Sequence, residues 1–492
     1  MNPKDLKRDM EILRENIAVV QRAERSSSSR KAKELFSVNP KHLNYEGRII
    51  EPYEDQKMRK MGSERKEDVG FQLPWSVDKG TLEPLPASDF GGTLLDEEIR
   101  RFAKWIEPTA AERVARQAVA YEVNDVIESA MSDFEDTAWN IFGSSKTGLL
   151  SPVSDIDVRI YDTRDTNADV GRKLRNMVDQ FNALRGAFKD SKTFTDPTVR
   201  YGRFPLLNFT HAATGIEIQL VASNDTAPQN EVMTRFLDEF PRVHEVFYVV
   251  RAMFSMRGFL DVWSGGLGSY GLFIMLVAAL KRYSAARPEM SMYASNQLLA
   301  FLHFYRDLDM EKHGVSVSRN SRFLKHDPDP KYETFAELAA KRGDSARAGQ
   351  WLIGQKRPLT HWLLCLQDPA DPTNDLGRRS HAIKHIQRTM TNTANWLVAT
   401  KKLLTKEYGS KRDYRSRHDS VLTMIVGRCD LRWRQRRSMM ERYGETIMAR
   451  EREEDASRSL SAAAADAEAA AQELEKAFHA GQVNEDRSAA KN

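Results

Sequence analysis

The chain has 492 residues, which is too long for one ordinary hydrophobic core and favours two domains with additional peripheral segments. Its 74 basic and 70 acidic residues give a formal net charge of only +4, so total charge does not indicate a nucleic-acid partner. The two cysteines, Cys365 and Cys429, exclude a disulfide framework and a cysteine-built zinc site, and the longest apolar run, residues 267–280, is too short to span a bilayer.

Residues 1–90 have the composition of a largely flexible N-terminal arm. Apolar residues at helical spacing over 6–23 are followed by the serine run 26–29 and by a stretch with few apolar side chains. The early acidic residues Asp5 and Asp9 are atypical of a secretory signal or a transit peptide. We therefore expect the cytosol or the nucleus, and no membrane association.

Residues 91–240 have the periodicity of a small domain with a mixed sheet and preceding helices. Apolar residues recur on one helical face from Leu94 until Pro108 ends the pattern, and apolar and polar residues alternate over 156–160. The elements expected here are helices over 94–107, 109–137 and 168–188, a strand over 156–160, and extended runs over 198–209 and 216–222, the last two joined by a turn at 213–215.

Residues 241–410 are expected to form a mostly helical central domain, because nearly every periodic segment there has helical spacing. The expected helices cover residues 242–257, 269–284, 295–307, 333–341, 346–353 and 380–404. Together with the preceding domain, this pattern predicts an α+β fold.

Residues 411–492 are expected to form a C-terminal tail that is first basic and then rich in Ala and Glu. Between residues 411 and 452, 12 Lys or Arg face 6 Asp or Glu, most densely over 432–437. Trp433 among these arginines suits contact with an RNA backbone, and a charged, solvated helix explains the composition equally well. Residues 457–478 predict a solvated helix that frays at its end.

The stretch that carries chemistry is an Asp-x-Asp pair, Asp155 and Asp157, on the expected strand. Carboxylates two residues apart on a strand project from one face, with Cα atoms about 6–7 Å apart. Such a pair can share two Mg²⁺ ions about 3.5–4 Å apart, an arrangement that phosphoryl transfer uses. Gly143 and Ser144 lie just upstream, in a turn whose backbone N–H groups can bind phosphate oxygens.

A third carboxylate is expected from Glu217, which has the same apolar flanks as the aspartates. The alternative is an outward-facing Glu on an alternating strand. Two other Asp-x-Asp pairs, in 307–309 and 327–329, lack the Gly-Ser context, and we expect them to be surface charge.

The order Gly-Ser, Asp-x-Asp and a later acidic strand residue resembles the DNA polymerase β-type nucleotidyltransferase superfamily. Residues 265–270 (Gly-Gly-Leu-Gly-Ser-Tyr) resemble the start of a helix in the central domain of poly(A) and poly(U) polymerases. Asp368-Pro369 and residues 372–378 resemble the nucleotide-recognition loop of their PAP-associated segment. The likeness covers about residues 74–445 and is closest to the nuclear TRAMP-type poly(A) RNA polymerases.

The resemblance implies template-independent addition of adenylates from ATP to RNA 3′ ends, with Mg²⁺ or Mn²⁺ as the cofactor. It also implies an active site in the cleft between the mixed-sheet domain and the helical domain. The implied residue roles are metal binding and catalysis by Asp155, Asp157 and Glu217, triphosphate binding by Gly143, Ser144, Arg251 and Ser269, ribose contact by Asn224, base stacking by Tyr270, and recognition of the base edge by Asn374 and Asp375.

Two residues depart from the family pattern, which usually has Asp at the position of Glu217 and Lys at that of Arg251. Both substitutions keep the charge, so we expect an active enzyme, while a catalytically weak RNA-binding scaffold on the same fold stays open. Asn374 favours ATP, because an amide can both donate and accept at adenine. Uridylyl-adding relatives typically place His near this position, which also favours ATP here. A terminal uridylyl or cytidylyl transferase stays open as an alternative.

The sequence has no recognisable RNA-binding module, which predicts only modest intrinsic affinity for RNA. The resemblance therefore implies partners that supply RNA contacts, namely a zinc-knuckle RNA-binding protein and an RNA helicase. It also implies a role in RNA surveillance or processing, in the nucleus, with the cytoplasm or the mitochondrion as alternatives.

Overall fold

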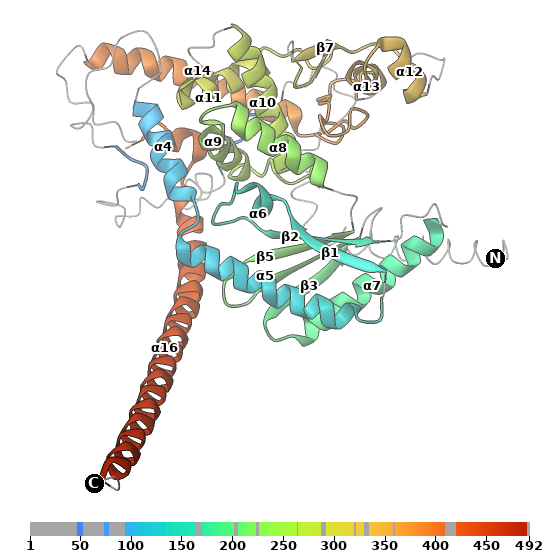
Figure 1. Cartoon of the computed structure of the whole chain (residues 1–492). Coiled ribbons are helices and arrows are strands. Elements are labelled where there is room, and N and C mark those ends of the chain that lie inside the picture. Colours follow the sequence, from blue (N-terminus) through green and yellow to red (C-terminus); the bar gives the residue numbers. More distant parts are fainter. Residues whose placement is uncertain are drawn as a thin grey trace, which may run out of the picture.

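The computed structural model describes residues 47–52, 73–77, 94–134, 136–163, 170–200, 205–222, 226–262, 264–286, 292–318, 321–328, 334–357, 360–408 and 420–489. The main sheet has five strands. Figure 1 shows this sheet flanked by helices below a larger helical region, so the predicted α+β class is confirmed. The predicted helix over 6–23, Asn224 and the basic residues 411–419 lie outside the described residues.

The sheet belongs to the mixed-sheet domain predicted from the sequence, called the palm domain below, in which helices cover one face. Its strand order is β1-β2-β5-β4-β3, with β2 and β5 parallel and all other neighbours antiparallel. The elements of this domain are helices α5 (Ala110–Met131) and α7 (Val170–Asp190), the one-turn α6 (Ser144–Thr147), and strands β1 (Thr137–Phe142), β2 (Ile156–Asp162), β3 (Phe194–Arg200), β4 (Leu206–His211) and β5 (Glu217–Ala222).

Alternation along the strands separates the core face of the sheet from its polar face. Ile156, Val158 and Ile160 of β2 are buried in a core with side chains of α5 and α7. Asp155 and Asp157, which flank Ile156 in the sequence, therefore project to the opposite face. The sheet thus presents the acidic pair on the side that the two helices leave uncovered.

Two predicted elements differ from the structure. The predicted helix over 109–137 ends at Met131, and residues 137–142 instead form β1, whose neighbour in the sheet is β2. The extended run 198–209 contains parts of two strands, β3 and β4, which pair antiparallel with an irregular register. In both places pairing with another strand decides the conformation, and periodicity within the segment does not record that pairing.

The helical domain is built around an apolar core that includes α4 (Leu94–Ile106). Helix α10 is buried all round over residues 271–280, which explains its continuous apolar sequence. The domain contains α8 (Ala227–Glu239), α9 (Val243–Ser255), α10 (Ser269–Ala286), α11 (Ala294–Arg306), α12 (Phe335–Arg342), α13 (Ser345–Ile353), α14 (Ile383–Tyr408) and the one-turn α15 (Thr423–Val426). The six predicted helices correspond to α9 to α14, with boundaries that differ by at most four residues.

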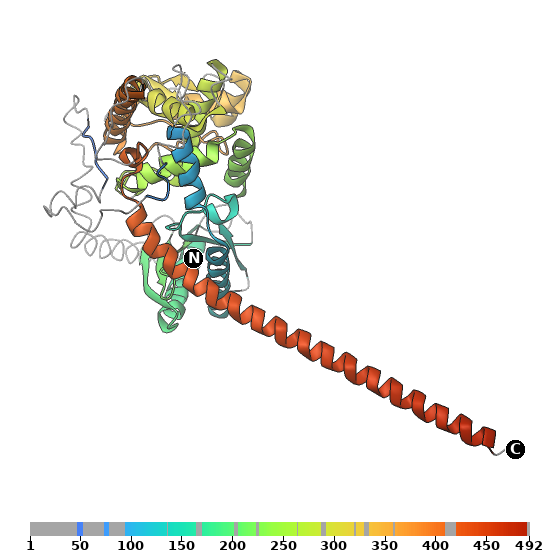
Figure 2. The same ribbon diagram turned by 90° about the vertical axis from the view of Figure 1, so that its left-hand side faces the viewer.

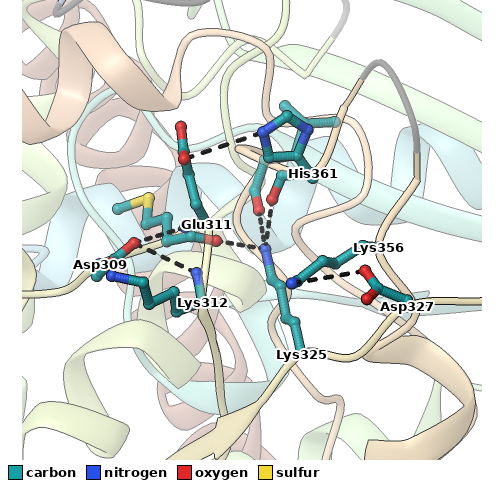
Figure 3. A network of polar contacts seen from close by, with 9 residues as sticks. Asp309, Glu311, Lys312, Lys325, Asp327, Lys356 and His361 are labelled. Atoms are coloured by element: carbon teal, nitrogen blue, oxygen red, sulfur yellow. Dashed lines mark hydrogen bonds and ion pairs between the residues drawn. The ribbon is translucent and has the colours of Figure 1, made fainter.

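A buried lysine ties together the loops around the small hairpin β6 (His313–Val315) and β7 (Arg322–Leu324). The Lys325 ammonium donates to the backbone carbonyls of Met310, His361 and Leu363, at 2.5, 2.9 and 2.7 Å (Figure 3). Three acceptors satisfy all three N–H groups, which compensates for burial of the charge. Lys325 thus anchors the segment that leads into the loop around residues 366–377.

The long C-terminal helix α16 (Asp430–Ala489) joins the two domains before it leaves the body. Trp433 is buried in the helical core and Met440 in the palm core, whereas residues 451–470 are exposed and project as a rod (Figures 1 and 2). The first part of the expected tail is therefore an integral structural element. Trp433 stacks on Trp105, with ring centroids 6.0 Å apart. Its side chain is buried, so it lies neither on a solvated face of the helix nor on a surface open to RNA.

Parts of the N-terminal region also contribute to the helical domain. Trp75, which lies within the expected arm, is fully buried, and its indole N–H donates to Thr423 at 3.1 Å. Among the described residues, no helix is both long and apolar enough to cross a membrane.

Candidate active site

Asp155 and Asp157 lie at the start of β2, and Gly143 packs directly against Asp157. Phe142, the last residue of β1, is the register partner of Asp157, so the chain turns at Gly143 beside the carboxylate. Gly143 has φ +70° and ψ −142°, and a Cβ there would overlap the Oδ2 atom of Asp157. Only glycine fits this backbone conformation and this close approach.

The acidic pair is held in a poorly solvated place. Burial raises the pKa of Asp157 to about 7, and the nearby Asp155 charge adds to the effect. Burial also raises the pKa of Asp155, against the opposing influence of the Arg251 guanidinium. Two close carboxylates that are both costly to ionise form a donor set that a divalent cation would stabilise.

Two arginines from different helices fix the turn that delivers Asp155. Arg116 of α5 donates from Nη2 to the carbonyl oxygens of Ser151 and Ser154, at 3.0 and 2.9 Å. Arg251 of α9 donates from Nη1 to the Oγ atom of Ser154 at 2.9 Å. The Ser154 hydroxyl also accepts from the backbone N–H of Ser151 at 2.9 Å, so the turn is bonded both internally and to both domains.

Arg251 lies where a phosphate-binding residue is expected, but it already has protein partners. Its Nη1 also approaches the Leu149 carbonyl and the Ser151 hydroxyl, each at 3.3 Å. These are long, shared contacts to neutral groups, and burial lowers the pKa of Arg251 from its usual value. An anionic ligand would therefore be a stronger partner than the present acceptors.

Glu217 occupies the expected strand position, but its side chain does not join the pair. Ile156 and Ile218 are register partners in the parallel β2–β5 ladder, which places Asp155 and Glu217 side by side. The Glu217 side chain is 62% exposed and accepts from Nη2 of Arg436 in α16 at 3.2 Å. As the side chains lie, no three His, Cys, Asp or Glu residues within the described part of the chain could together hold a metal ion.

The residues present fit a divalent cation at the pair, whereas Glu217 does not complete the site in this conformation. Asp155 and Asp157 supply oxygen donors of the kind that Mg²⁺ and Mn²⁺ prefer. The Ser144 hydroxyl is a further sign of a missing ligand, because its Oγ is buried and has no hydrogen-bond partner among the described residues.

A cavity of about 210 Å³ lies over Asp155, between the two domains. The palm domain contributes Asp155 and Glu217 to its wall, and the helical domain contributes Arg251 and Ser269. The remaining lining residues are Ile106, Ser151, Val153, Tyr248, Ser255, Leu260 and Trp433. Asp155, Glu217 and two of the expected phosphate-binding residues therefore line one inter-domain space.

Tyr270 and Asn374 are both bonded to one buried carboxylate, Asp368. The Tyr270 hydroxyl donates to Oδ1 of Asp368 at 2.8 Å, and the Asn374 amide donates to Oδ2 at 3.0 Å. Burial, followed by the Asp368 charge, raises the pKa of Tyr270. Asp368 thus fixes the expected stacking residue relative to the expected base reader.

Asp375 has a structural role in the same loop. Its Oδ1 accepts from the backbone N–H groups of Leu366 and Gly377, each at 2.9 Å. Since this oxygen closes the loop, recognition of a base edge by Asp375 would require its other oxygen or a rearrangement. The sequence did not predict that Arg116 and Arg436 belong to the site, or that Asp368 positions other residues in it. Each acts through a partner far away in the chain.

Comparison with known proteins shows what this fold with its acidic pair is similar to. Residues 95–237 match the family model described as poly(A) RNA polymerase, mitochondrial-like, central palm domain. These residues are therefore similar to the palm domain of that family, and the chain is similar to the Trf4- and Cid14-type poly(A) RNA polymerases.

Two curated relatives illustrate the likeness. The inactive non-canonical poly(A) RNA polymerase protein Trf4-2 of Drosophila melanogaster is 28% identical over 298 residues, which cover 59% of this chain and 65% of that protein. Poly(A) RNA polymerase CID14 of Cryptococcus neoformans is 25% identical over 305 residues, 60% of this chain and 35% of that protein. The match thus spans less than two thirds of either relative.

A solved structure shows that the likeness extends to the fold. The polymerase core of TRAMP, an RNA surveillance complex, is 19% identical with a TM-score of 0.53, and covers 73% of this chain and all of that chain. The predicted resemblance to this family is confirmed.

Proposed function

We propose that this protein is a template-independent RNA nucleotidyltransferase that adds adenylates from ATP to RNA 3′ ends. One observation carries the proposal: Asp155, of the poorly solvated pair Asp155 and Asp157, lines an inter-domain cavity that Arg251 and Ser269 also line. The relation to poly(A) RNA polymerases supports the substrate class.

The residues would divide the work between the acceptor hydroxyl and the triphosphate. Asp155 and Asp157 would hold divalent cations, which would lower the pKa of the RNA 3′-hydroxyl and offset the charge of the pyrophosphate. Gly143, Ser144 and Arg251 would bind the triphosphate through backbone N–H groups, the free hydroxyl and the guanidinium. Most of the rate enhancement would come from positioning and charge stabilisation, because the turn before Asp155 is already fixed by two arginines.

Base selection would depend on Tyr270 and Asn374, which Asp368 holds together. With its amide N–H occupied by Asp368, Asn374 retains a carbonyl oxygen that can accept from the N6 amino group of adenine. Asn374→His should shift nucleotide preference toward UTP, measured as the ratio of extension rates with ATP and with UTP. An unchanged ratio would remove Asn374 from base recognition.

The decisive experiment is an extension assay with labelled RNA and a single nucleotide at a time, in Mg²⁺ or Mn²⁺. Wild-type protein should extend RNA with ATP, and Asp155→Asn and Asp157→Asn should each lose about 10³-fold or more of the rate. The matched control is Asp309→Asn, because Asp309 belongs to another Asp-x-Asp pair and bonds only surface neighbours in the network of Figure 3. Wild-type rates in both active-site variants would contradict the proposal. Preference for UTP or CTP would correct only the nucleotide.

A second candidate is a catalytically silent RNA-binding scaffold. Two observations favour it: the Glu217 side chain is engaged by Arg436, and one relative carries the name of an inactive polymerase. This candidate predicts that ATP binds to the wild-type chain without extension of any RNA under any of the assay conditions.

The proposal also covers binding partners and cellular location, and for these it rests on the family likeness alone. We infer that a zinc-knuckle RNA-binding protein and a helicase supply RNA contacts, and that the protein acts in nuclear RNA surveillance or processing. Binding of RNA by the isolated chain, with a dissociation constant in the nanomolar range at physiological salt, would make such partners unnecessary.

A further inference from the structure

Glu217 lies where two cavities meet, and its backbone position suits a third metal ligand. The inter-domain cavity and a second cavity of about 310 Å³ are both lined by Asp155 and Glu217. The second cavity extends over the polar face of the sheet, where it is lined by Asp196, Thr198, Arg200, Asn208, Phe209, Thr210, Ile218 and Gln219. The parallel register places Asp155 beside Glu217, and the Glu217 side chain is directed to Arg436 and away from the acidic pair.

The partner that draws Glu217 away is held firmly. The guanidinium of Arg436 lies over the turn between β4 and β5, with Nε and Cζ 3.6 Å from the position that a Cβ of Gly215 would take. Gly215 has φ +67° and precedes Glu217 by two residues, so the guanidinium and the carboxylate meet at the start of β5.

The helix that carries Arg436 is anchored on both sides of this residue. Trp433 packs in the helical core and Met440 in the palm core. Arg437 pairs with Glu112 at 3.1 Å and donates to the backbone carbonyls of Trp105, Ile106 and Glu107 at the end of α4. The Cα of Arg436 is therefore fixed, and any exchange of partner must occur through the side chains.

The ion pair itself is weak enough to be exchanged. With Glu217 62% exposed, its contact with Arg436 is a solvent-screened pair of low net free energy. A guanidinium binds phosphate in a bidentate manner, which is a stronger interaction than a single exposed contact with a carboxylate. Glu also has one more methylene than Asp, so its carboxylate can reach either Arg436 or the neighbouring aspartates.

We propose that Arg436 is a positioning residue that holds Glu217 out of the cation site until a phosphate of the acceptor RNA takes the guanidinium. Glu217 then turns toward Asp155 and Asp157, so binding of the acceptor completes the three-carboxylate site. This inference rests on the proposed function. It concerns assembly of the site and leaves the identity of the added nucleotide aside.

The test measures binding of Mn²⁺ to the purified full chain, through loss of the electron paramagnetic resonance signal of free Mn²⁺. Arg436→Gln should tighten binding about three- to fivefold, the range expected for loss of one exposed ion pair. The matched control is Arg442→Gln, which removes the same charge from an exposed residue of α16 whose Nε bonds Ser438 of its own helix. This control should bind Mn²⁺ like the wild type.

A non-extendable oligonucleotide with a 3′-deoxy end tests the role of the acceptor. Its addition should tighten Mn²⁺ binding to the wild type but not to Arg436→Gln, and the same addition to Glu217→Gln corrects for Mn²⁺ held by the RNA. Glu217→Asp keeps the charge but shortens the reach toward Arg436. The Glu217→Asp variant should bind Mn²⁺ tightly whether or not Arg436 is present. A circular dichroism spectrum of every variant checks that the fold is intact.

The outcomes separate this inference from the proposed function. Mn²⁺ binding that Asp157→Asn removes but Arg436→Gln leaves unchanged or weakens overturns the inference and leaves the proposed function standing. Absence of Mn²⁺ binding by every variant overturns both.

Discussion

Asp157 on β2 and Glu217 on β5 lie on the same face of adjacent strands, yet their side chains are held in very different ways. Asp157 is packed against the Cα of Gly143, and the turn before its neighbour Asp155 is bonded to arginines of both domains. Glu217 is largely exposed and is held by one contact with α16. The β2 side of the site is preorganised, whereas the β5 side depends on which cation Glu217 meets.

This difference indicates which substitutions should reduce the rate of catalysis and which should mainly reduce the stability of the fold. Substitutions on the β2 side move groups that would touch the reacting atoms, where misplacement by about 1 Å can cost about 100-fold in rate. Substitutions that disturb α16 act first on stability, because this helix joins two hydrophobic cores. The two sides can therefore be separated by measuring activity and stability on the same variants.

Gly143→Ala should have the largest effect. The new Cβ overlaps Asp157 and the backbone conformation is one that L-residues rarely adopt, so RNA extension should fall about 100-fold or more. The matched control is Gly148→Ala, at φ +74° with no atom within 4 Å of the added Cβ. It should cost only the backbone strain of about 1–2 kcal/mol, with activity nearly retained. Equal losses of activity in both variants would show that strain of the loop, and not the contact with Asp157, matters.

Gly444→Ala should mainly reduce stability. In an exposed helix this substitution normally stabilises by about 0.5–1 kcal/mol. Here a Cβ would overlap the carbonyl oxygen of Ala111 in α5, so we expect a destabilisation of about 1–3 kcal/mol, measured as a lower thermal midpoint. Gly186→Ala in α7 is the control, since no atom lies within 4 Å of its added Cβ, and it should raise the midpoint. A rise in both variants would mean that α16 does not pack closely on α5.

The same division explains how much could be predicted from the sequence. The β2 side was accessible because Gly143, Ser144, Asp155 and Asp157 follow one another within fifteen residues, and their spacing alone places them at one strand end. Helices α9 to α14 were accessible for a similar reason, because helical spacing or a long apolar run is visible within each segment of the sequence.

Contacts between distant segments account for what the sequence did not reveal. Arg436 reaches Glu217 across 219 positions of the chain, and only packing of α16 on both cores creates that contact. Trp433 shows the same effect, because its arginine-rich neighbours suggested an RNA-binding or solvated surface whereas the side chain is 3% exposed. Composition describes the neighbours of a residue in sequence, and burial depends on its neighbours in space.

The smallest expected effect concerns docking of α16 on the palm domain, through a cluster around His211. The buried imidazole contacts the Thr214 hydroxyl at 2.8 Å and Glu122 of α5 at 3.2 Å, and Tyr443 of α16 donates to Glu122. The rings of Tyr443 and of Phe194 in β3 also pack on it. Burial lowers the pKa of His211 below its usual 6.5, and the carboxylate of Glu122 opposes this shift without cancelling it.

Because the pKa of His211 is lower in the folded chain than in the unfolded chain, the unfolded state binds more protons as the pH falls. The contribution to stability is therefore complete above pH 6.5 and is lost as the pH falls below that value toward the folded pKa. Between pH 7.5 and 5.5, the thermal midpoint of wild-type protein should fall more than that of His211→Gln. His244→Gln serves as the control, because this side chain is 46% exposed, and it should keep the wild-type pH dependence. If His211→Gln lost stability as steeply as the wild type, protonation elsewhere would control how α16 and the palm domain respond to acid.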